Sequence, residues 1–551
     1  MASFSRQNLR YYRERNYLCR ESKKESIKKK QNYTGADFCS GFFGLTWWQK
    51  CEVIVRIEGE REMKKYTVVL LGVLMFLMIP FDAFLNDIPK PLMWVCILFL
   101  AFSNYLLWRD KSKKKPTKII MTSLGGLVTL LLIADMYFSP YFNSINFRVS
   151  TNFNAIDYRD TVSAKEAMED LEFTVKKVKK IHPALKKGLT DEMQVKYEQA
   201  KAEINSRDYF TPEQLARIIE PVLSVLHDGH TLINAYFSTW HNYYLFYDND
   251  SLNLVGINGQ SMDEFFEAKS YLVSYDHPAF GKLNVLNLIT CLEGLEYYGV
   301  DVSNGVVYNF TDLEGNPVDI TAYEDEFITY AEYLEQNPTE TNSPSSDTEY
   351  EFASYEIDTD NNLAFFTLDS CEYNLKYINM VREFFEEVKE KKITNVCFDL
   401  RNNGGGNSLV ANEVIKYLDV DTYNEITCTA RFGPLLIDLG KPQKENKKVT
   451  DLTFTGDLYL LTSTNSFSSA MDFAMYVKDN RLGTIIGEEP GNDPNGYGDV
   501  AEFMTPNANL YFQVSYKKWN RIDINATDKY IVPDIPCDSR DAYDILLETI
   551  K

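Results

Sequence analysis

The chain has 551 residues, of which 57 are Lys or Arg and 79 are Asp or Glu, so its formal net charge is −22. This length exceeds one ordinary domain, and an apolar fraction of 45% excludes a wholly disordered chain. The charge is uneven, because residues 1–65 carry a net +7, residues 66–118 carry +4, and the remaining 433 carry −33. A basic head and an acidic body indicate two different environments.

Three apolar runs follow one another in the head, at residues 66–85, 91–108 and 119–134. Each is close to the ~20 residues that an α-helix needs to cross a bilayer. Asp82 and Asp135 lie near the ends of these runs, where a charge costs least. The alternative is three buried helices of a soluble protein. We expect three transmembrane helices within residues 63–140, with membrane lipid as a partner.

Loop charges predict how these helices are oriented. Residues 109–118 carry six positive charges, whereas residues 86–90, the loop before them, are nearly neutral. Because positive loops stay in the cytoplasm, residues 1–62 are expected to form a basic cytoplasmic tail. Everything after about Pro140 is then outside the cell membrane of a multi-pass protein. Met63 is followed by two lysines and an apolar run, so it is also a candidate start of translation.

The body, residues 141–551, divides by pattern into three parts. We expect a helical subdomain over 141–245, in which Thr211 and Pro212 form a good helix start. A mixed β subdomain with one helix, followed by a polar loop, is expected over 246–350. Strand-like and helix-like runs alternate over 351–551, and this alternation is typical of βαβ units in an α/β fold. The predicted strands are 363–368, 394–400, 457–462 and 484–487, with helices at 375–391, 408–418 and 468–478.

Cofactor signals are weak throughout. The nine cysteines form no CxxC pair, so neither a disulfide framework nor a zinc site is expected. His227, Asp228 and His230 could bind a metal, but no further ligand cluster accompanies them. We therefore expect no metal and no cofactor. Nucleic-acid binding is disfavoured, because the basic regions adjoin the membrane on its inner side.

Three segments carry the chemistry. In the first, a strand runs into Gly404, Gly405 and Gly406, whose amides could approach an anion closely. No Lys follows as in a phosphate loop, so an oxyanion hole fits better than nucleotide binding. A plain tight turn is the alternative.

The second segment is the hydroxyl-rich turn TSTNSFSSAMD at residues 462–472, between a strand and a helix. A serine there exposes its Oγ and is suited to nucleophilic attack, although the same residues suit an ordinary helix cap. The third segment is His227-Asp228-Gly229-His230-Thr231. Histidine is the usual general base near neutral pH, while a packed structural histidine is the default for one residue alone.

Together, the segments LRNNGGG, TNSFSSAMDFA and VLHDGHT resemble the C-terminal-processing (tail-specific) peptidases and their tricorn-core relatives. The resemblance spans residues 182–534. It implies a crotonase/Clp-protease-like α/β core with a helical N-terminal subdomain, and a serine-type endopeptidase acting on peptides or proteins. In the family pattern a small residue and an acid follow the nucleophile, which makes Ser469 the nucleophile, with Ser466 and Ser468 as competitors. The amides of Gly405, Gly406 and Ala470 then form the oxyanion hole.

One departure from the family pattern decides the expected base. Tail-specific members use a lysine about 25 residues after the serine, but this chain has no lysine between Lys478 and Lys517. The tricorn-like branch uses a histidine from the helical domain, and His230 matches it. A downstream acid completes the set in that branch. Asp528 is the nearest candidate, with Asp523 and Asp534 behind it, although the family alignment places Thr527 at or beside this position.

The resemblance therefore implies acyl transfer, in which His230 takes the proton of Ser469 and an acyl-enzyme forms and is hydrolysed. Two other readings remain. The body could be a catalytically inactive surface module that binds peptides or a polymer. It could also be another acyl hydrolase such as an esterase, although no G-x-S-x-G turn is present.

Overall fold

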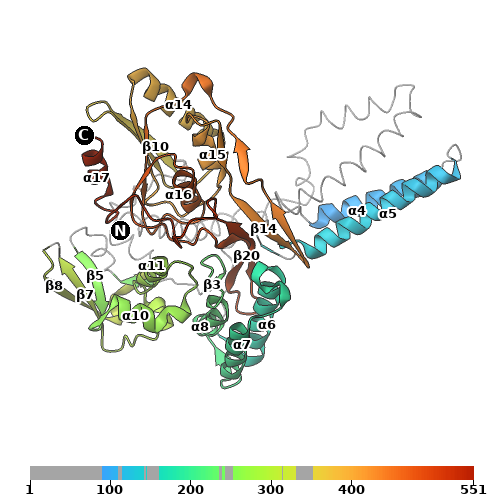
Figure 1. Ribbon diagram of the computed structural model, residues 1–551. Coiled ribbons are helices and arrows are strands. Elements are labelled where there is room, and N and C mark those ends of the chain that lie inside the picture. Colours follow the sequence, from blue (N-terminus) through green and yellow to red (C-terminus); the bar gives the residue numbers. More distant parts are fainter. Residues whose placement is uncertain are drawn as a thin grey trace, which may run out of the picture.

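The computed structural model describes residues 90–109, 114–141, 144–145, 161–234, 239–241, 252–312, 314–329 and 352–551 (Figure 1). The predicted tail 1–62 and the first predicted span, 66–85, lie outside these residues. The other two apolar runs form helices α4 (Lys90–Arg109) and α5 (Lys115–Phe138), which lie side by side and project from the body (Figure 1).

One described helix, Lys115–Phe138, is long and apolar enough to cross a membrane, whereas the apolar part of its neighbour, Met93–Arg109, is shorter. The two helices pack through a small cluster that includes Met93 and Leu132. The Trp108 indole also donates to Thr122 Oγ1 at 2.8 Å. The prediction of three transmembrane helices is thus not confirmed: by this criterion one candidate span is found among the described residues.

The predicted helical subdomain contains three α-helices within residues 161–234. Its helices start at strong N-caps, because Ser163 with Glu166 and Thr211 with Gln214 each form a reciprocal capping box. The helix start predicted at Thr211 and Pro212 is therefore confirmed. The elements are β1 (Val162–Ser163), α6 (Ala164–Ile181), η2 (Pro183–Lys187), α7 (Asp191–Ile204), β2 (Tyr209–Phe210), α8 (Pro212–Ser224) and β3 (Leu232–Asn234).

The next region combines a four-stranded antiparallel sheet, of order β6-β5-β7-β8, with more helix than expected. The prediction of a single helix is wrong, since three α-helices lie between β6 and β7. The elements are β4 (Thr239–His241), β5 (Leu252–Ile257), β6 (Gln260–Ser261), α10 (Met262–Lys269), η3 (Ser270–Leu272), α11 (Pro278–Leu288), α12 (Leu292–Tyr297), β7 (Val306–Asp312), β8 (Pro317–Ala322), η4 (Glu324–Glu326) and β9 (Phe327–Thr329).

The α/β core has a six-stranded sheet of order β10-β11-β12-β17-β18-β21, parallel except for the edge strand β10. The predicted βαβ alternation is confirmed. Helices α14, α15 and α16 pack over one large cluster of buried side chains, and α17 packs with a second, smaller cluster. The elements are β10 (Ala353–Asp358), β11 (Leu363–Leu368), α14 (Leu375–Lys391), β12 (Asn395–Asp399), α15 (Leu409–Ile415), β17 (Asp457–Thr462), α16 (Ser469–Asp479), β18 (Thr484–Gly487), β21 (Ile535–Pro536) and α17 (Ala542–Thr549).

A second antiparallel sheet, of order β15-β14-β20-β19, joins the core to the helical subdomain. Strand β3 pairs with β20 through Ile233 and Phe512, so the segment just before β3 is carried to the α/β core. Its strands are β14 (Thr427–Phe432), β15 (Leu435–Leu439), β19 (Tyr497–Met504) and β20 (Tyr511–Asn520). Nearby in the chain, β13 (Thr422–Asn424) and β16 (Gln443–Glu445) form a separate two-stranded sheet, followed by η6 (Thr450–Leu452).

Candidate active site

Ser469 is the first residue of α16, at the turn that follows β17. Its side chain is nearly buried, with 4% of the residue exposed. Ser468, which precedes it, has φ 55°, a conformation that side-chain-bearing residues rarely adopt. Backbone strain of this kind persists where the surrounding structure enforces it, and it is concentrated at functional sites. The turn therefore holds Ser469 in a specific orientation at the start of a helix.

The competing serines have other roles or positions. Ser466 is fully buried, donates to the Leu400 carbonyl at 2.7 Å and accepts the Ser463 amide at 3.0 Å. The Ser468 amide donates to Asn492 Oδ1 at 2.8 Å. Ser466 is thus committed to holding the turn, which favours Ser469 as the reactive hydroxyl.

Ser469 Oγ lies in a short chain of hydroxyl and carboxylate groups. It is 2.9 Å from the Gly406 carbonyl oxygen and 3.1 Å from Ser408 Oγ. Ser408 Oγ in turn donates to Asp472 Oδ2 at 2.7 Å. A hydroxyl carries one hydrogen, so Ser469 donates either to Gly406 or to Ser408. Its proton is therefore held by acceptors inside the chain in this conformation.

Asp472 lies one turn along α16 from Ser469 and is almost fully buried. Burial raises the pKa of its carboxyl to about 7; the charge of Asp499 adds to this rise, and the hydrogen bond from Ser408 opposes it. The charge of this group consequently changes near neutral pH.

This pKa predicts how stability depends on pH. Because the carboxyl ionises near 3.8 when unfolded and near 7 when folded, its contribution to the unfolding free energy falls as pH rises between these values. The Asp472→Asn variant has no carboxyl to ionise at this position, so its unfolding free energy does not fall for this reason. We expect the unfolding free energy of Asp472→Asn, relative to wild type, to rise from pH ~5 to pH ~8, on the order of a few kcal/mol. Denaturant unfolding of the full chain in detergent at both pH values measures it. A pH-independent difference would contradict the prediction.

The glycine loop lies against the serine turn. Gly405 has φ 108° and Gly406 has φ 140°, which favour glycine. The expected oxyanion-hole amides are engaged within the chain: Gly405 N–H donates to Asn403 Oδ1 at 2.8 Å, and Ala470 N–H donates to the Phe467 carbonyl at 3.1 Å. An oxyanion would have to compete with these two acceptors.

Gly405→Ala is expected to destabilise the site strongly. A Cβ at Gly405 would lie 2.6 Å from Ser468 Cβ and 2.8 Å from the Phe467 carbonyl oxygen, in a left-handed backbone conformation. We expect a loss of about 1–3 kcal/mol of unfolding free energy or more, measured by denaturant unfolding. Gly404→Ala is the matched control: no atom lies within 4 Å of its added Cβ, so a change of less than about 0.5 kcal/mol is expected. Equal effects of the two variants would contradict this account.

His230 reaches the core in the loop that precedes β3. Its ring packs against the Phe467 ring at a centroid distance of 4.5 Å, and Phe467 is two residues before Ser469. Within the described residues, neither ring nitrogen has a hydrogen-bond partner by ordinary geometric criteria. Burial lowers the pKa of His230 below 6.5, although the charges of Asp228 and Asp499 oppose this. The imidazole is therefore neutral at pH 7 and able to accept a proton. Its ring lies beside the serine turn without a bond to Ser469.

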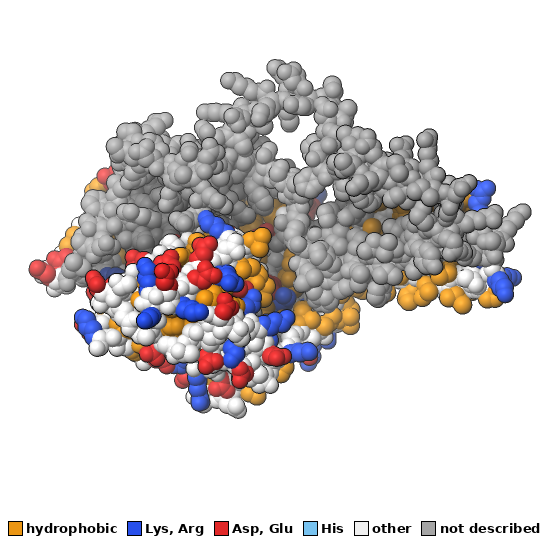
Figure 2. All heavy atoms as spheres, turned by 90° about the horizontal axis from the view of Figure 1, so that it is seen from above, with side chains coloured by type: hydrophobic (Ala, Val, Ile, Leu, Met, Phe, Trp, Pro, Cys, Tyr) orange, Lys and Arg blue, Asp and Glu red, His pale blue; other side chains and the backbone are white. Residues whose placement is uncertain are grey.

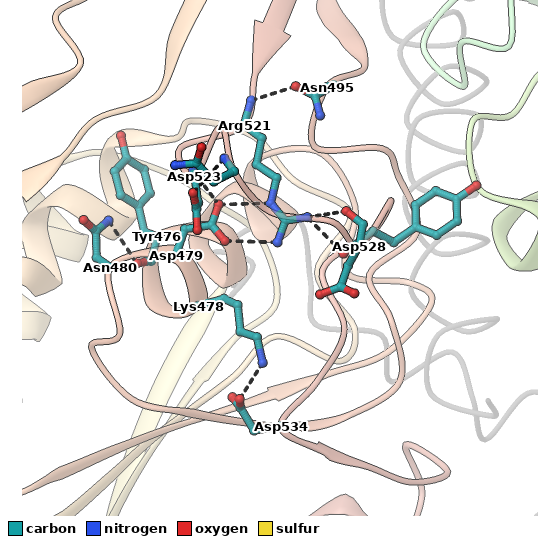
Figure 3. A network of polar contacts seen from close by, with 11 residues as sticks. Tyr476, Lys478, Asp479, Asn480, Asn495, Arg521, Asp523, Asp528 and Asp534 are labelled. Atoms are coloured by element: carbon teal, nitrogen blue, oxygen red, sulfur yellow. Dashed lines mark hydrogen bonds and ion pairs between the residues drawn. The ribbon is translucent and has the colours of Figure 1, made fainter.

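The downstream acids lie elsewhere. Asp528 is exposed, and its backbone carbonyl accepts from Arg521 Nη1 at 2.6 Å, while Arg521 also pairs with Asp479 at 3.1 Å (Figure 3). Asp523 and Asp534 belong to the same region, which surrounds the C-terminal end of α16 (Figure 3). At ~1.5 Å per residue, that end is roughly 15 Å from Ser469. The structure brings Ser469, the glycine loop and His230 into one region but does not bring Asp528 there.

Three polar residues of the site have no part in the reaction expected from the sequence. They are Ser408, Asp472 and Asp228, which bond to Ser469, Ser408 and the His230 backbone amide respectively. Asp472 and Asp228 each lie in the same motif as a proposed catalytic residue. Their closeness to that residue in the sequence was the signal that could have identified them. Ser408 offers no such signal, because only the fold brings it to Ser469.

Comparisons with known proteins agree with this architecture. The family model of Peptidase family S41 matches residues 363–537. No curated protein matches the chain in sequence. Among solved structures, a CPAF mutant aligns with a TM-score of 0.50 and 10% identity, covering 70% of this chain and 96% of that chain. At this identity the likeness shows the fold alone.

Two further structures are similar at lower scores. The photosystem II D1 C-terminal processing protease has a TM-score of 0.38 and 12% identity, covering 68% of this chain and 93% of its own. The tricorn protease has a TM-score of 0.32 and 11% identity, covering 70% of this chain but 37% of its own. The family match runs from β11 to β21 and includes the glycine loop and Ser469, so this part of the chain is similar to the serine peptidases of family S41, and the match supports a C-terminal processing peptidase family.

Proposed function

We propose that this chain is a membrane-anchored endopeptidase, with its peptidase body outside the cell, that cleaves peptide or protein substrates through an acyl-enzyme on Ser469. The observation that carries the proposal is the position of Ser469. It is nearly buried at the start of α16, preceded by the strained Ser468, and its Oγ faces the glycine loop at 2.9 Å.

In the proposed mechanism, substrate binding draws the Ser469 hydroxyl away from Gly406 and Ser408 toward His230. Neutral His230 accepts the proton as Oγ attacks the peptide carbonyl. The Gly405 and Ala470 amides release Asn403 and Phe467 and, with the Gly406 amide, stabilise the oxyanion; Ala470 lies at the positive end of α16. His230 then gives the proton to the leaving amine, and a water hydrolyses the acyl-enzyme with His230 again as the base. No metal or cofactor takes part in these steps.

Support for anchoring comes from the projecting helices α4 and α5. Their surface bears apolar side chains, with Lys and Arg at the far end (Figure 2). Exposed large apolar residues there include Trp94, Phe99, Ile120, Leu127 and Leu130. A bilayer would remove this apolar surface from contact with water, which is energetically favourable.

The base of the anchor is joined to the body at β20 and α6. Tyr141 Oη lies 3.0 Å from Tyr516 Oη on β20, and Lys180 Nζ donates to the Tyr137 carbonyl at 2.6 Å. These contacts support a body held close to the membrane surface from which α5 emerges.

The test is hydrolysis of a peptide library by the full chain in detergent, with products identified by mass spectrometry. Internal cleavage by the wild type, absent from Ser469→Ala, is expected. Retention of peptides without any cleavage would contradict the proposal and favour a binding module. Whether the body is outside is tested separately, by its digestion with added protease on intact cells; a body protected on intact cells and digested only after lysis would contradict the proposed topology.

A further inference from the structure

A buried carboxylate and a second histidine lie beside His230. Asp228 and His182 both have side chains that are 0% exposed, and His182 Nε2 is 3.2 Å from Asp228 Oδ2. His182 Nδ1 accepts the Ala184 amide at 3.3 Å, so Nε2 carries the hydrogen that is donated to Asp228. The other oxygen, Asp228 Oδ1, accepts the His230 backbone amide at 2.9 Å and lies 3.8 Å from His230 Nδ1.

We propose that Asp228 is the positioning acid of this site, holding His230 with Nδ1 toward Oδ1 and Nε2 free for Ser469, in place of a downstream acid. This rests on the proposed function. The carboxylate acts on His230 from within the same three-residue turn, so its placement does not depend on the exposed segment around Asp528.

The surroundings of Asp228 keep its carboxyl ionised. Burial would raise the pKa of its carboxyl, but the hydrogen bond that His182 donates, the attraction of the two neighbouring histidines and the hydrogen bond of Thr231 lower it to about 2. A local turn in which Asp accepts an amide two residues later needs one carboxylate oxygen and is common at surfaces. Here the second oxygen, Asp228 Oδ2, also accepts a hydrogen bond, from the buried His182 Nε2. The His182 carbonyl is fixed in turn by Arg431 Nη1 at 2.6 Å. Such a fully buried, ordered charge stabilises the imidazolium that forms during acyl transfer.

Other charges face this group from neighbouring elements. Asp499 on β19 also acts on His230, but it is paired with Lys517 on β20 at 2.5 Å and its side chain is 42% exposed, so its effect is partly cancelled and screened. Asp276, before α11, faces Asp228, and burial and the repulsion of Asp228 hold the pKa of Asp276 well above the ordinary range, so it ionises less readily than Asp228. Asp228 is therefore the strongest fixed negative charge at His230.

The experiment measures fluorophosphonate labelling of the full chain in detergent, as a rate constant at several pH values. The wild-type rate falls at low pH as His230 becomes protonated. In Asp228→Asn we expect the plateau rate to fall by about 10²-fold or more. The low-pH inflection should also move to lower pH, because the charge that raised the pKa of His230 is gone. Asp538→Asn, a surface change of the same type, should alter the plateau by less than about twofold.

Three outcomes decide the matter. An unchanged inflection and plateau in Asp228→Asn would overturn the proposal. So would a large loss in Asp528→Asn with Asp228→Asn at the wild-type rate, which would assign the acid to the downstream segment. Wild-type labelling of Ser469→Ala would instead overturn the proposed function and leave the geometry of Asp228 without a catalytic role.

A second pair of variants covers the case in which Asp228→Asn does not fold. His182→Leu removes the donor to Asp228 Oδ2 and is expected to lower the plateau about tenfold, whereas the amide of His182→Gln can still donate and should restore most of the rate. A wild-type rate in a folded His182→Leu, or equal losses in both variants, would overturn the proposal.

Discussion

Ser469→Ala is expected to abolish fluorophosphonate labelling and to lower peptide hydrolysis by at least about 10⁴-fold. The physical reason is that Ser469 Oγ, at the start of α16, lies 2.9 Å from the Gly406 carbonyl oxygen of the glycine loop and is the proposed attacking atom. The change removes one buried oxygen that bonds Gly406 and Ser408, so the protein should remain folded. Labelling followed by gel fluorescence, beside a kinetic peptide assay, measures both quantities.

The matched control is Ser206→Ala, which removes an exposed hydroxyl at the end of α7. It should label and cleave as the wild type does. Persistent labelling of a folded Ser469→Ala would transfer the nucleophile to another residue of the turn, and loss of labelling in both variants would expose a general defect of the preparation.

His230→Ala is expected to lower the labelling rate by about 10³-fold or more at pH 7, because the imidazole that packs against Phe467, two residues before Ser469, is the proposed base. In contrast to Ser469→Ala, the hydroxyl remains. The residual rate should therefore increase with pH, as hydroxide replaces the missing base. Rate measurements from about pH 6 to about pH 10 separate the two variants.

His230→Gln provides the comparison for His230→Ala. Glutamine can form a hydrogen bond but cannot take up a proton, so the two variants should lose similar amounts of activity. Near wild-type activity in His230→Gln would mean that His230 only orients Ser469 and that another group accepts the proton. The raised pKa of Asp472 and its link to Ser469 through Ser408 would make Asp472 the first residue to examine.

The α/β core is the part of the fold that the sequence predicts best. Its strands at Leu363–Leu368, Asp457–Thr462 and Thr484–Gly487 and the helix at Leu375–Lys391 have the bounds expected from their patterns. These strands are buried on both faces of a parallel sheet, so they are short continuous apolar runs, and the helix between them has a strong apolar face.

The region of β5 to β8 is predicted less well for a physical reason. Helix α11 has its apolar residues spread around its circumference, since Leu283 and Val285 are both buried, and α12 has six residues. Neither helix produces a clear 3.6-residue pattern. Tertiary contacts stabilise them, including the stacking of Phe280 on Phe467 at 4.2 Å, and a local reading of the sequence does not contain those contacts.

The residues of the site also divide into those that local motifs indicate and those that only the fold brings together. Local motifs are enough to propose Ser469, Gly405 and Gly406 as site residues, because a strand, a turn and a helix start lie within each motif. The approach of His230 depends on the pairing of β3 with β20, some 280 residues apart in the chain. Choosing Asp528 by its spacing from Ser469 could not take account of Arg521, which draws the Asp528 backbone toward Asp479 (Figure 3).

The site of covalent modification by a fluorophosphonate identifies the nucleophile of this protein. The full chain in detergent is treated with a fluorophosphonate, digested, and the modified peptide sequenced by mass spectrometry. If Ser469 is the nucleophile, one adduct forms, on Ser469 of the folded wild type, and it is lost on prior denaturation. An adduct on Ser408, Ser466 or Ser468, or peptide cleavage by a chain that forms no adduct, would contradict this assignment.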